Sequence, residues 1–533
     1  MSKFINKHPL VFLILFCILA YGFNLTGLPI SIMEARNFNV AKEMLTGGNW
    51  FLTTMNAVPR YEKPPLPSWI TSAFISFDLN SLFLYRIPTS LIAALGVIFI
   101  YFLTKVLSNR KQIALMSALI LGTSFYYITI RFEAPSDTYT HVFMIGSLLF
   151  MAKAIKNKQY LILNICLAIV FLGCSILSKG PVSLYALYLP FIIAYFIVYK
   201  NTKQNYLISL ISLVMGFGLG AIWYIYVRVE DPAVFTKIAS KETSNWASYN
   251  VRPFYYYWSF FIQSGVWTIP ALLSLFYPYF KAKVIDKKLY QFSWLWTALA
   301  VILLSVIPEK KSRYLVPVLI PLALNTAQLI HYQIKTKKLD KVSQIGMKFH
   351  YLLLLIIGIS VVTVPYFIEV RTTEFWVWYY CLVLLMFGFG AAVFFNYSPL
   401  HLKKLFYATL VLITIITSVG LYGIKFMQQN NDYRTLAEAN LNKDDQVYYF
   451  KTIRPEAIWE SGVISKPINF EDNQPEGVFK VIIEKYRIAE FKEILPVGYS
   501  IQKIEIYDRN FFISKEKSRH KDNHVNYVLT LKY

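Results

Sequence analysis

The chain has 533 residues, of which 56% are hydrophobic, 17% are aromatic and only 16% carry charge. This composition excludes a disordered or ordinary soluble protein, because the apolar residues form repeated runs of about twenty residues, the length of a bilayer crossing. The formal net charge of +23 would suit nucleic-acid binding. However, the basic residues gather in short loops between apolar runs, as the positive-inside rule describes. The sequence predicts a polytopic α-helical membrane protein without a nucleic-acid partner.

The apolar runs predict roughly thirteen membrane-spanning helices. In chain order they cover residues 9–28, 81–103, 112–130, 138–154, 160–177, 181–199, 205–228, 259–280, 289–307, 314–331, 349–368, 375–395 and 404–425. No A-x-A-like cleavage site follows the first run, so we expect it to act as a signal anchor.

Lysine-rich loops predict the orientation of the bundle. With a cytoplasmic N-terminus, the short basic loops around residues 105–111, 153–158, 281–288, 335–341 and 403–404 all fall inside, as the positive-inside rule requires. An odd number of spans then places the loops 29–80 and 229–258, and everything after residue 425, on the outer face. We expect residues 1–425 to form the transmembrane domain and residues 426–533 a separate domain outside the membrane.

Several basic residues break the positive-inside trend on that outer face, and their shared location suggests a common site. They are Arg36, Arg60, Lys63, Lys179, Lys310, Lys311 and Arg313. Arg binds phosphate through its planar fork and Lys as a point charge, so an anionic ligand explains them together. For any single one of these residues, the alternative is contact with lipid headgroups or snorkelling of the side chain toward the membrane surface.

Two acids accompany these cations. Asp137 follows Pro135 at the start of a predicted helix, where it could simply cap the N-terminus. A charge near bilayer depth is costly, which favours a wet cavity or a partner instead. Glu34 lies just after the first span, where a local ion pair with Arg36 is the alternative to a functional role. Pro64 and Pro65 cannot continue a helix and restrict the residue before them. We therefore expect Glu62 and Lys63 to lie in a rigid non-helical loop.

Other kinds of site find no support in the sequence. The four cysteines all lie in predicted spans, so they do not outline a disulfide framework. The seven histidines include no HExxH pattern, and we expect the one HxxxH pair, His520 and His524 in a charged tail, to be solvated. There is no Gly-rich phosphate loop. Soluble nucleotide-sugar chemistry is therefore not indicated.

The last hundred residues change in character, with more charge and no further spans. Strand-like runs at 447–450, 478–483 and 501–507 and a helix-like run at 484–495 predict a small α/β domain. Its role, whether to admit an acceptor or to stabilise the membrane part, stays open.

The order of these features resembles the GT-C class of lipid-linked-sugar glycosyltransferases, the superfamily of bacterial aminoarabinose transferase and the protein O-mannosyltransferases. Seven segments carry the resemblance in order: Glu34-Ala35-Arg36, 44–50, 60–69, Asp137, 178–181, 252–257 and 311–317. The Glu62-Lys63-Pro64 run and the Lys179-Gly180 pair are similar to the aminoarabinose-transferase branch.

The resemblance implies an inverting transfer from a polyprenyl-phosphate sugar to an acceptor hydroxyl or amine on the outer face of a bacterial inner membrane. It implies that Asp137 and Glu34 are the functional carboxylates. The donor phosphate or substrate would be bound by Arg36, Lys63, Lys179, Arg252, Lys311, Arg313 and Tyr314. Arg252 matches if a one-residue shift in its loop is allowed.

The sequence departs from the family pattern at two positions. Met33 stands where relatives have an Asp, which makes Glu34 the single acid of that loop and its role as base less secure than that of Asp137. Asn250 stands where metal-binding relatives have a His. We therefore predict no cofactor and no required metal, with Glu62 as the contact if a divalent ion binds.

Other functions remain open at this stage. A lipid or solute transporter or flippase would also place charges in a many-span bundle, although the chain shows no related halves. A non-catalytic scaffold is a further alternative. Within the enzyme class, transfer to protein Ser or Thr competes with the preferred acceptor, a lipid A-like glycolipid or other envelope glycan. We expect membrane lipids as partners and a monomer.

Overall fold

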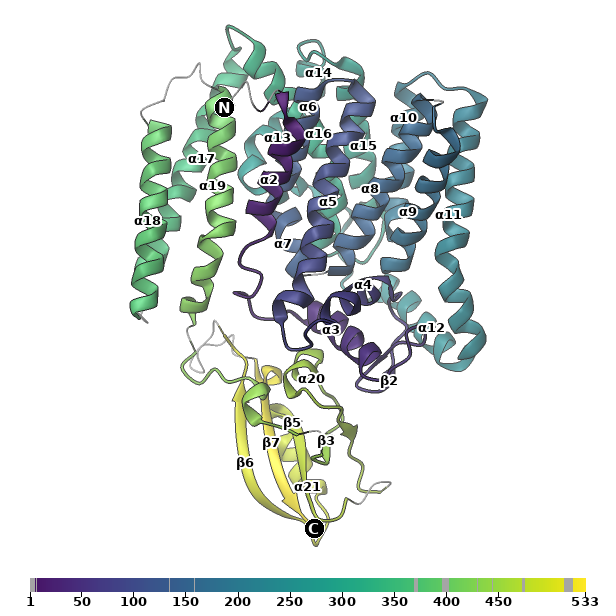
Figure 1. Ribbon diagram of the computed structural model, residues 1–533, viewed down its shortest axis with the longest axis vertical. Coiled ribbons are helices and arrows are strands. Elements are labelled where there is room, and N and C mark those ends of the chain that lie inside the picture. The colour runs from purple at the N-terminus through teal and green to yellow at the C-terminus, as the bar shows by residue number, and fades with distance from the viewer. Residues whose placement is uncertain are drawn as a thin grey trace.

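The computed structural model describes residues 5–533, except for positions 6, 134, 158, 369–371, 395–401, 429, 443, 472–474 and 512–520. It consists of a bundle of apolar helices with a small sheet attached to one end of that bundle (Figure 1). We call this end, where the sheet is attached, the sheet end, and the opposite end of the bundle the far end.

Eight helices among the described residues are long and apolar enough to cross a membrane. They are α5 (Leu82–Ser108), α8 (Pro135–Lys156), α9 (Leu161–Lys179), α11 (Lys203–Glu230), α15 (Lys287–Val306), α16 (Val316–Lys335) with its leading 3₁₀ turn η4 (Ser312–Leu315), α17 (Lys341–Tyr366) and α18 (Thr373–Phe394). Two bent pairs raise the number to ten: α6 (Lys111–Thr123) with α7 (Phe125–Glu133) at 48°, and α19 (Leu402–Ser418) with η5 (Gly420–Met427) at 40°. The protein is a multi-pass membrane protein, as predicted.

The remaining three predicted spans are helical but short or broken. Residues 9–28 contain α2 (Pro9–Tyr21), and residues 181–199 contain the π-helical turn η1 (Leu184–Tyr188) followed by α10 (Leu189–Val198). The segment 259–280 divides into η3 (Phe260–Trp267), α13 (Thr268–Ser274) and α14 (Tyr277–Phe280), so the prediction of one continuous helix there is wrong. Gly265 interrupts it with a φ of 65°, which a right-handed helix cannot accommodate. The last residue of the span predicted over 375–395 lies outside the described residues.

Helices α8 and α16 form the centre of the bundle. In the apolar stretches of these two helices, 83% and 94% of the residues are buried inside the protein. The corresponding shares in α17 and α18 are only 22% and 28%. The second pair stands at the margin of the bundle (Figure 1). Polar side chains on α8 and α16 therefore meet other protein groups and not lipid.

Three further helices, a hairpin and a short 3₁₀ turn cover the sheet end of the bundle. They are α3 (Ile32–Leu45), α4 (Leu66–Ile75), α12 (Pro232–Ser248), the strands β1 (Thr54–Met55) and β2 (Val58–Pro59), and the 3₁₀ turn η2 (Phe254–Tyr257). Helix α3 begins with a capping box in which Ser31 and Glu34 satisfy each other's backbone N–H groups. The segment 29–80 therefore contains two helices, with a non-helical stretch before α4 as the paired prolines predict.

The C-terminal part contains a five-stranded mixed sheet in the order β4-β3-β5-β7-β6. Its strands are β3 (Val447–Tyr449), β4 (Lys466–Pro467), β5 (Val478–Glu484), β6 (Ser500–Asp508) and β7 (Val525–Lys532), accompanied by α20 (Pro455–Ser461), α21 (Ile488–Ile494) and the turns η6 (Leu436–Ala439), η7 (Lys485–Arg487) and η8 (Asp522–His524). Strands β3, β5 and β6 and helix α21 confirm the predicted elements. The sequence prediction missed β4 and the inner strand β7.

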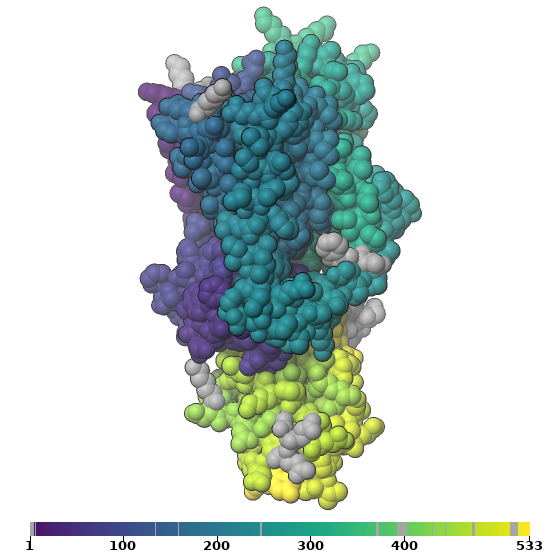
Figure 2. Space-filling model, turned by 90° about the vertical axis from the view of Figure 1, so that its right-hand side faces the viewer, coloured from purple at the N-terminus to yellow at the C-terminus, as the bar shows by residue number. Residues whose placement is uncertain are grey.

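Helix α20 docks the sheet onto helix α3. Trp459 contacts the rings of Phe38 and Tyr85, with centroids 5.4 and 4.6 Å away. Asn56 and Ser465 exchange two hydrogen bonds of 2.8 Å through the Asn side chain and the Ser backbone. Figure 2 shows the yellow-green C-terminal part directly against the purple segment that carries α3.

Candidate active site

The predicted site residues lie at the sheet end of the bundle (Figure 1). Asp137 is in the first turn of α8, Lys179 is the last residue of α9, and Arg36 is on α3. Arg313 and Tyr314 lie in η4, at the entrance to α16. The bundle thus brings together side chains that are widely separated in the sequence.

Asp137 is the most buried acid of this group, with 1% of its surface exposed. Its Oδ1 accepts a hydrogen bond from Lys179 Nζ and lies 3.9 Å from Nε2 of His141. Its Oδ2 is buried and has no hydrogen-bond partner among the described residues. A buried carboxylate oxygen without a protein partner is a candidate contact for a substrate.

Lys179 is presented to Asp137 by the turn that ends α9. Gly180 has a φ of 84°, and a Cβ at this position would lie 2.9 Å from the Tyr224 hydroxyl. The Lys179 ammonium also lies 5.2 Å from the centre of the Tyr314 ring. The turn therefore requires glycine, both for its backbone conformation and for the space beside it.

A second ion pair borders Tyr314. Glu309 Oε1 accepts hydrogen bonds from Lys311 Nζ at 2.6 Å and from the Tyr314 hydroxyl at 3.0 Å. Arg313 has a longer contact, 3.9 Å, with Glu133. The predicted phosphate ligands Lys179, Lys311 and Arg313 each meet an acid in this structure.

A pocket lined by three cations lies beside Asp137. Its volume is about 380 Å³ including the open mouth. It is lined by Met33, Arg36, Asn37, Val40, Thr53, Arg60, Lys63, Pro64, Pro65, Ser68 and Ser136. No acid is among these lining residues, and Ser136 places the pocket next to the first turn of α8. We call it the cation pocket.

The cations of this pocket are only partly neutralised. Arg36 has Met33 Sδ, at 3.5 Å, as its hydrogen-bond partner among the described residues, and Arg60 Nε lies 3.9 Å from Glu62. Lys63 makes the one close ion pair, at 3.1 Å to Glu242 of α12. Burial lowers the pKa of Arg60 to about 10, with a contribution from the neighbouring Arg36 and against the opposing effect of Glu62 and Glu242. A bound anion would relieve this concentration of positive charge.

Glu34 occupies a different environment from the one predicted. Its two oxygens accept bonds of 2.7 and 3.0 Å from Arg86, and Oε2 also accepts the Ser31 backbone N–H at 3.0 Å. Arg86 in turn donates to the carbonyl of Leu25 at 2.7 Å. The alternative of a local pair with Arg36 and the expected position in a loop are both wrong, because α3 turns Glu34 into the bundle. Neither carboxylate oxygen is free for a substrate.

Arg252 and Glu62 stand apart from the Asp137 centre. The Arg252 side chain is exposed and lies 6.0 Å from the Tyr256 ring, while its backbone pairs with the segment before Lys311. Glu62 has Arg60 as its neighbour. No group of three His, Cys, Asp or Glu side chains suited to a metal ion occurs in the part of the chain that the structure describes.

Four residues of this region were not among the predicted catalytic and substrate-binding residues. Arg60, Glu309 and His141 lie within a few residues of Lys63, Lys311 and Asp137, so local spacing could have indicated them. Arg86 lies 52 residues from Glu34 and offered no such signal.

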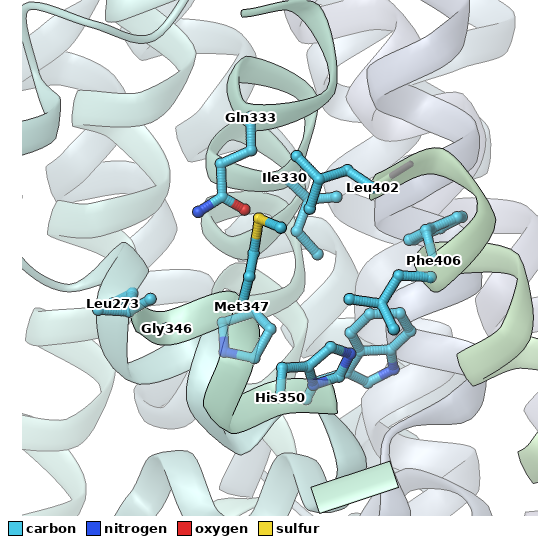
Figure 3. A pocket seen from close by; sticks show the side chains of 11 residues that line it. Leu273, Ile330, Gln333, Gly346, Met347, His350, Leu402 and Phe406 are labelled. Carbon is cyan, nitrogen blue, oxygen red and sulfur yellow. The ribbon is translucent and has the colours of Figure 1, made fainter. Parts of the chain in front are cut away.

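A second hollow lies toward the far end of the bundle, between α13, α16, α17 and α19. Figure 3 shows its lining, which consists of Trp267, Pro270, Leu273, Ile330, Gln333, Gly346, Met347, His350, Leu402, Leu405 and Phe406. Its lining is mostly apolar and includes none of the predicted site residues.

Comparison with known proteins relates this arrangement to membrane sugar transferases. Residues 62–229 match the family model described as dolichyl-phosphate-mannose-protein mannosyltransferase. An uncharacterized protein of Aquifex aeolicus is 25% identical over 340 residues, which is 63% of this chain and 65% of that protein. An undecaprenyl phosphate-alpha-4-amino-4-deoxy-L-arabinose arabinosyl transferase of Photorhabdus laumondii is 22% identical over 354 residues, 64% of this chain and 61% of the relative. The alignments thus span less than two thirds of either relative.

The fold agrees over a longer stretch. The crystal structure of ArnT from Cupriavidus metallidurans bound to undecaprenyl phosphate superimposes with a TM-score of 0.71 at 13% identity. The superposition covers 99% of this chain and 98% of that one, so both the helical bundle and the C-terminal sheet belong to the shared fold.

Proposed function

We propose that this chain, which belongs to the GT-C superfamily of aminoarabinose transferases and protein mannosyltransferases, transfers a sugar from a polyprenyl-phosphate donor to an acceptor at the membrane surface. One observation carries this proposal. A buried carboxylate with an unsatisfied oxygen, Asp137 Oδ2, stands next to a pocket lined by Arg36, Arg60 and Lys63. The reaction requires an acid beside a cluster of cations that can bind the phosphate.

The cation pocket would hold the donor phosphate. When the bond between the sugar and the phosphate oxygen breaks, the phosphate gains negative charge, and fixed cations stabilise that charge without further reorganisation. Arg36 and Arg60 can form paired hydrogen bonds with phosphate oxygens, and Lys63 adds a point charge. Arg60 therefore joins the residues that the sequence predicted.

Asp137 would act as the general base. Lys179 favours the ionised carboxylate through its hydrogen bond to Oδ1, and Oδ2 stays available for the proton of the acceptor. General-base catalysis of this kind contributes typically about 10²- to 10⁴-fold. A direct attack by the acceptor inverts the anomeric carbon and needs no protein nucleophile. We propose a structural role for Glu34 instead, because Arg86 and Ser31 occupy both of its oxygens.

For the acceptor, we prefer a lipid A-like glycolipid or another envelope glycan, since arabinosyl transferases are among the relatives. The match to the protein-mannosyltransferase model over residues 62–229 supports Ser or Thr of exported proteins as the second candidate. We propose a monomer in a bacterial inner membrane, working without a cofactor or required metal.

The orientation follows from charge. The basic segments 105–111, 281–288 and 335–341 join helices at the far end of the bundle, and Lys403 and Lys404 lie in the first turn of α19 at that end. The positive-inside rule assigns that end to the cytoplasm. The cation pocket and the sheet would then face the outside.

Mass spectrometry of envelope glycolipids and exported proteins tests the proposal. Cells with the wild-type chain, with Asp137→Asn and without the chain would be compared. A sugar-sized mass difference that requires Asp137, on lipid or on protein, supports the transferase and identifies its acceptor class. Equal masses in every pool, despite good expression, would favour a transporter. Activity that survives exhaustive chelation supports the absence of a required metal, and its loss with rescue by a divalent ion contradicts it.

A further inference from the structure

A cluster of buried polar side chains lies directly behind Asp137, and the mechanism above does not use it. It consists of Thr140, His141, Ser175 and Ser183, none of which is more than 2% exposed. The cluster joins α8 to the end of α9 and to the residue that precedes the π-helical turn η1. Turns of this kind occur often at functional sites.

His141 connects this cluster to the carboxylate. It stands four residues after Asp137 on α8, which places the two side chains on the same face. Its Nε2 lies 3.9 Å from Asp137 Oδ1, and its Nδ1 lies 2.9 Å from Ser183 Oγ. The ring is thus held so that Nε2 faces the carboxylate.

The hydroxyl hydrogens allow His141 two states. The Thr140 hydroxyl donates to the Ser175 carbonyl at 2.9 Å, which uses its single hydrogen. The Ser183 hydroxyl can either donate to His141 Nδ1 or turn toward Thr140 Oγ1, 3.3 Å away, and accept from Nδ1. In the first state Nε2 carries the proton, and in the second Nε2 is a proton acceptor facing Asp137.

The charged groups near His141 belong to the Asp137 centre. They are Asp137 on the same helix and Lys179 on α9, while η1 contributes the neutral Ser183. His350 offers a contrast, since it is also buried but its Nε2 contacts Thr409 at 3.1 Å and its ring stacks on Trp267. His350 lines the hollow near the far end (Figure 3) and faces no carboxylate among the described residues.

We propose that His141 is a positioning residue that shares the proton of Asp137. This inference rests on the proposed function. In the transfer step the sugar–phosphate bond breaks with its electron pair on the phosphate, and the acceptor oxygen bonds to the sugar. The acceptor proton passes to Asp137. His141 Nε2, with Nδ1 donating to Ser183, then takes this proton and restores the carboxylate. The protonated His141 loses the proton to bulk water before the next cycle.

Labelling of Asp137 with dicyclohexylcarbodiimide tests the shared proton without requiring transfer activity. The reagent adds to protonated carboxylic acids, and peptide mass spectrometry would count both the adduct and any amide crosslink to Lys179. Purified wild type, His141→Gln and the matched control His350→Gln would be labelled across a pH series. We expect the midpoint of labelling in His141→Gln to rise by about one pH unit, because the carboxylate loses the group that takes its proton. The midpoint in His350→Gln should equal that of wild type.

Equal midpoints in wild type and His141→Gln would overturn the proposal. If His141→Gln does not fold, His141→Asn and Ser183→Ala provide the same comparison. In a transfer assay, His141→Gln should lower kcat by about 10²-fold at unchanged donor KM, and it should change the pH profile of kcat. A shifted labelling midpoint in a protein without transfer activity would reject the proposed function while keeping the His141–Asp137 pair.

Discussion

The two charged regions at the sheet end of the bundle differ in how they are neutralised. Around Asp137, the cations Lys179 and Lys311 each contact a carboxylate, Asp137 and Glu309 respectively. In the cation pocket, Arg36 lacks an acidic partner among the described residues, and Arg60 has only a distant one. The cations of the first region are thus paired with acids, whereas in the described part of the second region Lys63 alone makes a close ion pair, with Glu242. This contrast supports the cation pocket as the proposed site of the donor phosphate.

The Glu34–Arg86 pair, which joins α3 to α5, sharpens the contrast. Glu34 is 1% exposed, and Arg86 saturates both of its oxygens. Arg36, two residues later on the same helix, lines the cation pocket. On helix α3, Glu34 is therefore neutralised by Arg86 inside the bundle, whereas Arg36 faces the pocket without an acidic partner among the described residues.

The substitution with the largest expected effect is Asp137→Asn, which tests the Asp137 side of this comparison. It removes the base but keeps the shape of the side chain, so transfer should fall by about 10²- to 10⁴-fold. Insertion and donor binding should be retained, which a kinetic assay beside a binding assay with polyprenyl phosphate would measure. Full transfer by this variant would remove Asp137 from the reaction.

Glu34→Gln should act on stability and not on chemistry. Removing one partner of a buried ion pair leaves the other charge uncompensated and costs about 3 to 5 kcal/mol. We expect a lower midpoint of thermal unfolding in detergent, with the remaining folded protein close to wild type in kcat. A large loss of kcat at normal stability would return Glu34 to the list of catalytic candidates.

The cation pocket should control donor affinity. Replacing Arg36, Arg60 or Lys63 singly with Ala removes a charge-assisted interaction worth about 1.5 to 3 kcal/mol, and donor KM should rise by about ten- to a hundredfold. Lys288→Ala, which changes an exposed lysine of α15 at the far end, is the matched control. Unchanged donor affinity in all three variants would move the phosphate site elsewhere.

An acid at the far end provides the smallest and most local test. Asp340 accepts hydrogen bonds from Tyr279 at 2.8 Å and from the Ser343 backbone at 3.0 Å, and it lies 3.4 Å from Lys283. Although burial acts to raise the pKa of this carboxyl, these bonds and charges lower it to about 2. The ionised form thus contributes about 2 kcal/mol to stability, which is present above about pH 4 and lost as the pH falls through about 2.

Asp340→Asn should therefore reduce thermal stability at neutral pH and remove that part of the acid sensitivity. Donor affinity should not change, because the cation pocket lies at the other end of the bundle. A change in donor KM would show that the two ends are coupled.

Several features of the site were predictable because they depend on local spacing or on membrane topology. Arg36, Lys63, Asp137 and Lys179 were predicted on one face, since an odd number of spans puts their segments on the same side. Pro135 begins α8, as its fixed φ favours. The strands β3, β5 and β6 follow from their runs of β-branched and aromatic residues.

Other features depended on partners far away in the sequence. The Glu34–Arg86 pair joins residues 52 positions apart, and the Asp137–Lys179 pair joins residues 42 positions apart. The spacing of residue types along the sequence does not indicate such long-range ion pairs. The break at Gly265 was also hidden, because an apolar run around one glycine reads like a continuous span.

The sequence by itself determined that this is a membrane protein and that a small α/β part follows the spans. It also determined which end of the bundle carries the isolated cations. These properties depend on hydrophobic run length and on the distribution of Lys and Arg, both of which are local. The tertiary structure decided which charges neutralise each other, because an ion pair depends on distances that helix packing sets. It paired Glu34 with Arg86 and Asp137 with Lys179, and it left Arg36 and Arg60 facing an open pocket.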